Sequence, residues 1–536
     1  MSLGRFTPLG WTRGLLAILA GLIVSFFLFG FFNPYWRVAD QDLLLIFDAF
    51  LQNDGLPRQI DFHPAHLIVA MLSATYRALH GLGLLETYSL STMPLASDVA
   101  AFTRSWTVAV QIARLLCLLI VLAYVTAFAF LLRALVKDWR VALLGTFAIA
   151  FSGGIAMSVR SIKPELLSGV FFAIALLILL ISARSPRLAA RPMLIGIAAF
   201  FATLAMDNKV QAIFLISTLP LLLLPFGEPS QQGGFWIGRR AAWALAASAL
   251  FALLAAIAAA PLVRQGLFAD EAVLTMRRVF DTGVFQTMLI VWIASGMLAF
   301  GLLWRVPLAE GLTAAFSIIA GISLGLLPLY FYRATSSIAK VISPLDALYY
   351  FVAPADSQCG PGGCGLPLAM LFDSIKGLLI HHTFFLQTSP RPEIFLEWVI
   401  IAGIAIAFRR REYKVALQAS FLICAVFAVD TLQAARALKQ DYFNYTDPLI
   451  IIAGALLLAK LTDLQNHRWT YPIGATLIAL HVAFSQAEPI KHAFLLRAGP
   501  ESKCDVLNGL RGMERFPFCK TRPPRSSHSW FSSVRN

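Results

Sequence analysis

The sequence predicts an all-α polytopic membrane protein with about thirteen transmembrane helices. Hydrophobic residues make up 58% of its 536 positions and charged residues only 13%, whereas a soluble domain has about 25% charged residues. The mean hydropathy is +0.74. The apolar residues also fall in runs close to the length of about 20 residues that an α-helix needs to cross a bilayer. Together these observations exclude an ordinary soluble protein.

The first apolar run, residues 15–32, follows Arg5 and Arg13. It is too long for the apolar part of a signal peptide and lacks a small-residue cleavage site, so we interpret it as a retained anchor. The same length rule predicts twelve further spans. These are residues 106–132, 141–158, 165–183, 192–207, 209–226, 241–262, 284–303, 311–332, 394–408, 414–433, 448–461 and 471–486.

The basic residues set the orientation. Four clusters, at 133–140, 184–191, 239–240 and 409–414, lie between apolar runs, as cytoplasmic loops do under the positive-inside rule. With a cytoplasmic N-terminus, all four clusters face the cytoplasm. The net charge of +14 therefore reflects topology, and we expect no nucleic-acid partner.

The domain organisation follows from this topology. Residues 1–486 form one transmembrane domain, with external loops at 33–105 and 333–393, and residues 487–536 form a short external tail. Within the first loop, the apolar stretch 64–82 is short and contains His66, Arg77 and His80, which favours a helix lying in the membrane interface. Counting it as a span would place the basic clusters outside.

Four cysteines fall in the segments placed outside. Cys359 and Cys364 share one segment, and Cys504 and Cys519 share the other. Pairing within each segment would give two disulfides in an oxidising compartment. A zinc site is the alternative, but these spacings are not of the CxxC type.

The first loop brings five carboxylates next to the first span: Asp40, Asp42, Asp48, Asp54 and Asp61. Charges beside hydrocarbon are costly, so this segment must lie in water or in a cavity. Asp40 is the leading candidate for a general base, which would take a proton from an attacking hydroxyl. The alternative is that Asp40 and Asp42 cap a helix over residues 43–51.

Three other segments carry candidate site residues. Arg160, Lys163 and Glu165 surround Pro164, which is well placed to open a helix; they form either an anion site or a set of interfacial anchors. Lys209, in a short external turn with Asp207 and Asn208, either meets a phosphate or pairs with Asp207.

The third segment precedes the twelfth span, where Arg436 can bind a phosphate bidentately and Tyr442 can stack on a sugar. Positive charge just outside a helix is also ordinary there. His63 with His66, and His381 with His382, form possible metal pairs, but histidines at an interface are more often hydrogen-bonded anchors. We expect no metal and no cofactor.

In their order along the chain, these segments resemble the polytopic GT-C glycosyltransferases that use polyprenyl-phosphate sugars. That superfamily includes bacterial relatives of the dolichyl-phosphate-mannose protein mannosyltransferases and the lipid A aminoarabinose transferase. The resemblance covers about residues 15–225, with a fainter likeness over 436–461. Four features carry it: Asp40 in ADQD, His63-Pro64, Lys163-Pro164-Glu165, and Lys209 in LAMDNKVQ. The sequence departs from the family pattern at Gln41, Ala65 and Lys163.

The resemblance implies a C-shaped helical fold, Asp40 as catalytic base, and inverting transfer on the outer membrane face. Our leading hypothesis is a transferase moving a hexose or pentose from a polyprenyl phosphate to a lipid or cell-envelope glycan. Substrate contacts are expected at Asp42, His63, Arg160, Lys163, Glu165, Lys209, Arg436 and Tyr442. The expected location is the bacterial inner membrane, with the site facing the periplasm.

Two other functions stay open. A polytopic transporter or lipid flippase is one alternative, although the halves look dissimilar and the ionisable residues gather at one face. The other is an envelope scaffold without catalytic activity.

Overall fold

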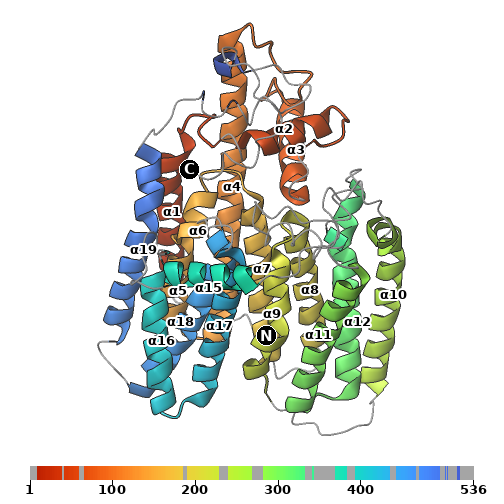
Figure 1. Ribbon diagram of the computed structural model, residues 1–536, viewed down its shortest axis with the longest axis vertical. Coiled ribbons are helices and arrows are strands. Elements are labelled where there is room, and N and C mark those ends of the chain that lie inside the picture. The colour runs from red at the N-terminus through yellow and green to blue at the C-terminus, as the bar shows by residue number, and fades with distance from the viewer. Residues whose placement is uncertain are drawn as a thin grey trace.

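In the part of the chain that the computed structural model describes, the protein is built from helices, with no strand. The described residues are 9–38, 42–59, 65–184, 190–228, 239–267, 282–331, 341–342, 368–382, 391, 393–434, 442–465, 470–494, 501, 504 and 516–519. Figure 1 shows most of the helices running side by side along the long axis of the molecule.

The first half of the chain contains α1 (Leu9–Phe26), η1 (Phe27–Phe31), α2 (Asp42–Asn53), α3 (His66–Gly81), α4 (Val99–Val136), α5 (Trp139–Ala150), α6 (Gly153–Ser158), α7 (Pro164–Ala183), α8 (Ala190–Asn208), α9 (Ala212–Leu223), η2 (Leu224–Phe226) and α10 (Arg239–Leu267). The second half contains α11 (Thr282–Leu303), α12 (Leu308–Leu326), η3 (Leu327–Phe331), α15 (Leu368–His382), α16 (Ile394–Arg409), α17 (Tyr413–Ala434), α18 (Phe443–Gln465), α19 (Thr470–Phe494) and η6 (Pro517–Cys519).

Among the described residues, seven helices are long and apolar enough to cross a membrane. They span Leu9–Phe31, Val99–Val136, Pro164–Ala183, Ala242–Gly266, Leu308–Phe331, Tyr413–Thr431 and Phe443–Leu461. The chain thus has the character of an all-helical membrane protein. The other apolar runs predicted from the sequence also fall in helices, which are not among these seven.

Residues from two of the predicted basic clusters, Arg133 and Arg184, lie at one end of the bundle. Arg133 lies over the ring of Trp11 near the start of α1, with 4.8 Å between the guanidinium carbon and the ring centroid. Arg184, after α7, donates to the Leu135 carbonyl at 3.1 Å and to Gln418 of α17 at 2.6 Å. These contacts join the ends of α1, α4, α7 and α17, so their basic residues share one face.

The opposite end carries α2 and α3 (Figure 1). α3 lies within the stretch 64–82 and is not one of the seven candidate spans. α3 packs on α2 and is tied to α4 by Tyr76, whose hydroxyl donates to the Ala109 carbonyl at 2.9 Å.

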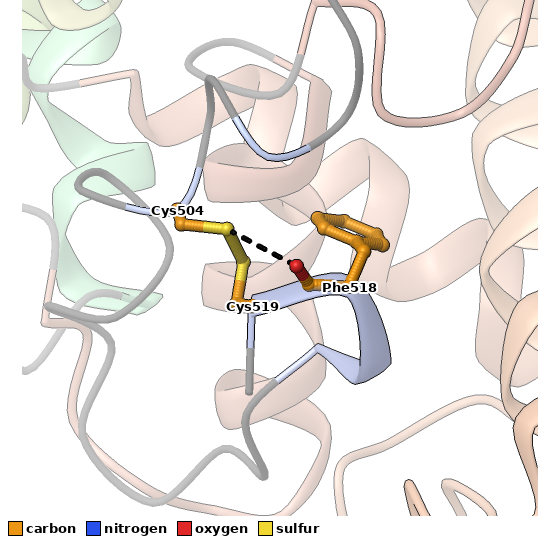
Figure 2. The surroundings of a disulfide bond; sticks show 3 residues. All are labelled: Cys504, Phe518 and Cys519. Carbon is orange, nitrogen blue, oxygen red and sulfur yellow. Dashed lines mark hydrogen bonds between the residues drawn. A yellow bond between two sulfur atoms is a disulfide. The ribbon is translucent and has the colours of Figure 1, made fainter. Parts of the chain in front are cut away.

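The C-terminal segment covers this same end. Cys504 and Cys519 form a disulfide, as predicted, and Figure 2 shows it beside Phe518. Phe516 packs on Trp106 of α4 and on Tyr35, with ring centroids 5.6 and 6.3 Å apart. The disulfide therefore holds the tail against the first loop. Cys359 and Cys364 lie outside the described residues.

Small residues let two helices approach closely in the second half of the bundle. A Cβ added to Gly321 of α12 would overlap the Gly196 carbonyl of α8, and one added to Gly325 would meet Thr203 at 2.6 Å. Packing of this kind is a main source of helix association in membranes, where the lipid is as apolar as the side chains.

Candidate functional site

Asp42 opens α2 and is fully buried. Its Oδ2 accepts from Arg114 Nη2 at 2.9 Å and Nε at 3.3 Å, and its Oδ1 accepts from the Ile162 backbone N–H at 2.7 Å. Burial raises the pKa of the Asp42 carboxyl above its ordinary value, although Arg114 opposes that shift. Asp42 thus joins α2 to α4 and to the 159–163 segment, in contacts that do not cap its own helix.

The acids of the first loop are largely engaged by the protein. Asp48 accepts from Arg58 Nε at 3.0 Å and from the Gln59 backbone N–H at 3.1 Å. Asp54 accepts from the Ser91 hydroxyl at 2.6 Å. Asp40 and Asp61 lie outside the described residues, and so the structure leaves the predicted base unplaced.

The Lys163-Pro164-Glu165 triplet begins a helix, as the sequence predicts, because Pro164 is the first residue of α7. Lys163 is buried and interacts electrostatically with both Asp42 and Glu165. Glu165 Oε1 lies 2.5 Å from Lys209 Nζ. The structure therefore brings together Asp42, Lys163, Glu165 and Lys209, four of the predicted site residues.

The turn after α8 supports α3. Asn208 accepts from the Ala65 and Ile68 backbone N–H groups, through its carbonyl at 3.0 Å and through its side-chain oxygen at 3.3 Å. Asp207 is fully buried, and within the described chain neither of its carboxylate oxygens has a hydrogen-bond partner. Lys209 pairs with Glu165, so the predicted alternative of an Asp207–Lys209 pair is wrong.

Arg160 is buried and has no carboxylate partner among the described residues. Its Nη2 donates to Ser25 of α1 at 2.9 Å and to Gln486 of α19 at 3.1 Å, and the guanidinium lies over the ring of Phe29. Its side chain takes part in no ion pair among the described residues, where Nε and Nη1 also find no acceptor. Burial lowers the pKa of Arg160 to about 10, so the group stays charged at neutral pH.

The remaining predicted residues are only partly placed. His63 and Arg436 lie outside the described residues. Tyr442, immediately before α18, is half-buried and packs against the main core. His66 is buried, with its Nδ1 3.3 Å from Arg58 Nη1.

A second buried group of charges, which the sequence reading missed, surrounds Arg391. We define the Arg391 cluster as His382, Arg391, Glu393, Glu397, Asp430 and Asp447. Arg391 is fully buried and faces all four carboxylates: Asp447 Oδ1 at 2.8 Å, Glu397 Oε1 at 3.3 Å, Glu393 Oε2 at 3.4 Å, and Asp430. Burial alone would lower its pKa, but these carboxylates raise it above its ordinary value.

His382 completes this cluster. Its Nδ1 lies 2.7 Å from Glu397 Oε2, and its Nε2 lies 3.2 Å from Asp430 Oδ2. Burial disfavours the charged imidazole, but the neighbouring carboxylates of Asp430 and Glu397 prevail and raise the pKa of His382 to about 9. Both ring nitrogens are therefore donors at neutral pH.

The sequence did hold a signal for this cluster. Glu397 and Asp430 each interrupt an apolar run predicted to cross the membrane. An ionisable residue inside such a run is by default a candidate functional residue.

Helix α6 links the two groups. Glu393 Oε1 accepts from the Gly153 backbone N–H at 3.3 Å, at the start of α6. At its other end, Ser158 accepts from Asn444 Nδ2 at 2.7 Å. A Cβ at Gly154 would lie 2.6 Å from the Asn444 backbone nitrogen, and one at Gly169 would lie 2.8 Å from its carbonyl oxygen. The start of α18 is thus wedged between α6 and α7.

Within the described part of the chain, no three His, Cys, Asp or Glu side chains are arranged to hold a metal ion. Comparisons with protein-family models, with curated proteins and with solved structures gave no match.

Proposed function

We propose that the protein is an inverting GT-C-like glycosyltransferase that takes a sugar from a polyprenyl phosphate. The observation that supports this best is Arg160, a buried guanidinium with two donor groups that find no acceptor in the described chain. A phosphate oxygen is a strong acceptor for a charged donor of this kind. Arg160 also lies in the segment whose Ile162 backbone N–H donates to Asp42. Asp42 follows the proposed base, Asp40, by two residues.

In the proposed reaction, Asp40 takes the proton of an acceptor hydroxyl, and the hydroxyl oxygen attacks the anomeric carbon. The bond between that carbon and the phosphate oxygen breaks, and polyprenyl phosphate leaves with the electron pair. Arg160 and Lys163 neutralise the charge that develops on the phosphate. Lys209, paired with Glu165, positions the α7 end of this segment.

The acceptor is a lipid or cell-envelope glycan, and the membrane is a bacterial inner membrane with the site facing the periplasm. We propose that the shorter apolar helices complete a bundle of thirteen crossings. The disulfide between Cys504 and Cys519 supports this orientation because disulfides persist in oxidising compartments. The adjacent Phe516 packs on Tyr35 and on Trp106, so the disulfide lies near the first loop.

The test uses purified protein, lipid-linked sugars and a candidate acceptor lipid. Asp40→Asn should abolish turnover with donor binding retained. Arg160→Gln should raise KM for the donor by about 10- to 100-fold, the effect of losing a charged hydrogen bond worth about 1.5–3 kcal/mol. Arg104→Gln is the matched control, because Arg104 is an exposed arginine near the start of α4. Wild-type turnover in Asp40→Asn, or an unchanged KM in Arg160→Gln, would contradict the proposal.

The Arg391 cluster favours a second candidate, an ion-coupled transporter, because buried ionisable residues often mark ion pathways in membranes. Reconstituted protein that moves a solute across vesicles and forms no covalent product would support this candidate over the transferase.

A further inference from the structure

The Arg391 cluster carries more negative charge than its own cations balance. Arg391 and protonated His382 supply two positive charges, whereas Glu393, Glu397, Asp430 and Asp447 supply four negative charges when ionised. All six side chains are buried. An uncompensated charge costs several kcal/mol in such a place, so the fully ionised cluster lacks positive charge.

Unused acceptor atoms mark where that charge is missing. Asp430 Oδ2 and Asp447 Oδ1 bind the two terminal nitrogens of Arg391, so these two carboxylates lie beside each other. Their other oxygens, Asp430 Oδ1 and Asp447 Oδ2, are buried and accept no hydrogen bond of ordinary geometry within the described chain, although the Ser152 hydroxyl lies near Asp447. Two oxygens of like charge therefore remain unsatisfied around one arginine.

An independent group points to the same place. His481 of α19 is fully buried and interacts electrostatically with Glu393 and Arg391. In the described chain neither of its ring nitrogens makes a hydrogen bond of ordinary geometry, although the Ala148 carbonyl lies nearby. A buried imidazole in this position can donate or accept as the charge of the cluster changes.

We propose that the Arg391 cluster is a binding site for a monovalent cation, a proton or Na⁺, held at Asp430 Oδ1 and Asp447 Oδ2. Arg391 already occupies the centre of the four carboxylates. A divalent ion would need several of the same oxygens to turn towards it. One positive charge on the outer oxygens halves the deficit of two charges and leaves Arg391 in place.

The elements around the cluster show which parts of the protein a bound cation would affect. His382 ends α15, which lies across the bundle in Figure 1; Asp430 is on α17 and Asp447 on α18. Glu393, immediately before α16, also binds Gly153 of α6. A cation here is therefore coupled through α6 to the segment that carries Arg160.

Infrared spectroscopy and thermal unfolding of the purified full chain distinguish the two cations. For a proton, wild-type protein at neutral pH shows the carbonyl band of a protonated carboxylic acid, and Asp447→Asn or Asp430→Asn removes it. For Na⁺, the unfolding temperature rises with NaCl but not with choline chloride, and the same variants lose that rise. Asp98→Asn is the matched control because Asp98 is an exposed helix cap, a role that Asn also fills.

Wild-type protein that shows neither the acid band nor the Na⁺ effect would overturn the proposal, because its carboxylates would then be ionised without a bound cation. This outcome is measured on wild-type protein, so it does not depend on whether a variant folds. The readouts are also independent of sugar transfer, so failure of the cation site and failure of the proposed transferase remain distinguishable.

Discussion

Lys209 Nζ lies 2.5 Å from Glu165 Oε1, and this ion pair holds the turn between α8 and α9 against the first turn of α7. Both side chains are buried. Each buried charge has a desolvation penalty, which the attraction between the two charges offsets. The pair therefore fixes the segment that also carries Lys163 and Arg160.

Lys209→Met should destabilise the protein by about 3–5 kcal/mol, because it leaves Glu165 buried without its cation. Adding Glu165→Gln should restore much of that loss, since no unpaired charge then remains. Chemical unfolding in detergent measures both effects. Lys414→Met is the control: its pair with Glu228 is about half exposed, and an exposed pair contributes about 0–1 kcal/mol. Equal losses in the two lysine variants would refute the buried-pair argument.

Gly321→Ala should destabilise the protein by about 1–3 kcal/mol, the usual cost of overpacking, because the added methyl overlaps the Gly196 carbonyl. Gly311→Ala is a control on the same helix, with no atom within 4 Å of the added Cβ. It should be neutral or stabilise by up to about 1 kcal/mol through helix propensity. Thermal unfolding compares the two, and a Gly321→Ala protein as stable as Gly311→Ala would contradict the observed packing.

The disulfide has a chemical test. Denatured, unreduced wild-type protein should bind as many maleimide labels as a Cys504→Ser/Cys519→Ser double variant, and after prior reduction the wild type should bind two labels more than the double variant. The double variant should lose about 3 kcal/mol of stability, as expected for a closed loop of about 15 residues. Two extra labels on unreduced wild-type protein would place the tail in a reducing compartment.

The helices were predictable because long apolar runs leave few alternatives in a membrane. The start of α7 was predictable to the residue, since Pro164 cannot continue a preceding helix. The break between α5 and α6 was not predicted: residues 141–158 read as one run. Ser152, Gly153 and Gly154 at this point are a local signal for such a break, and Asn444 approaches Gly154 closely there.

The candidate site was harder to predict, because helix packing determines which charged side chains meet. Lys209 is two residues from Asp207 in sequence, yet its partner is Glu165 on another helix. The Arg391 cluster draws its members from residues 382–447, on helices whose contacts no local pattern specifies. The sequence showed Glu397 and Asp430 inside apolar runs, but it did not show that both lie against Arg391.

Stability should depend on pH through His382. Its pKa in the folded protein is about 9, above the ordinary value of 6.5, so the protonated imidazole stabilises the fold. That contribution is complete below pH 6.5 and is lost as the pH rises through 9. At 1.36 kcal/mol per pKa unit, it amounts to about 3 kcal/mol.

The groups that face His382 make this effect specific. Glu397 of α16 and Asp430 of α17 bind its two nitrogens, Arg391 shares both carboxylates, and Phe427 packs edge-on against the ring. Unfolding measured from pH 6 to pH 9.5 should show a loss of stability in wild-type protein that is absent in His382→Gln. His80→Gln, at an exposed position on α3, should keep the wild-type slope, because a general alkaline effect would act on both variants alike. A His382→Gln protein with the wild-type slope would show that another group titrates, since its cluster has no imidazole left to lose a proton.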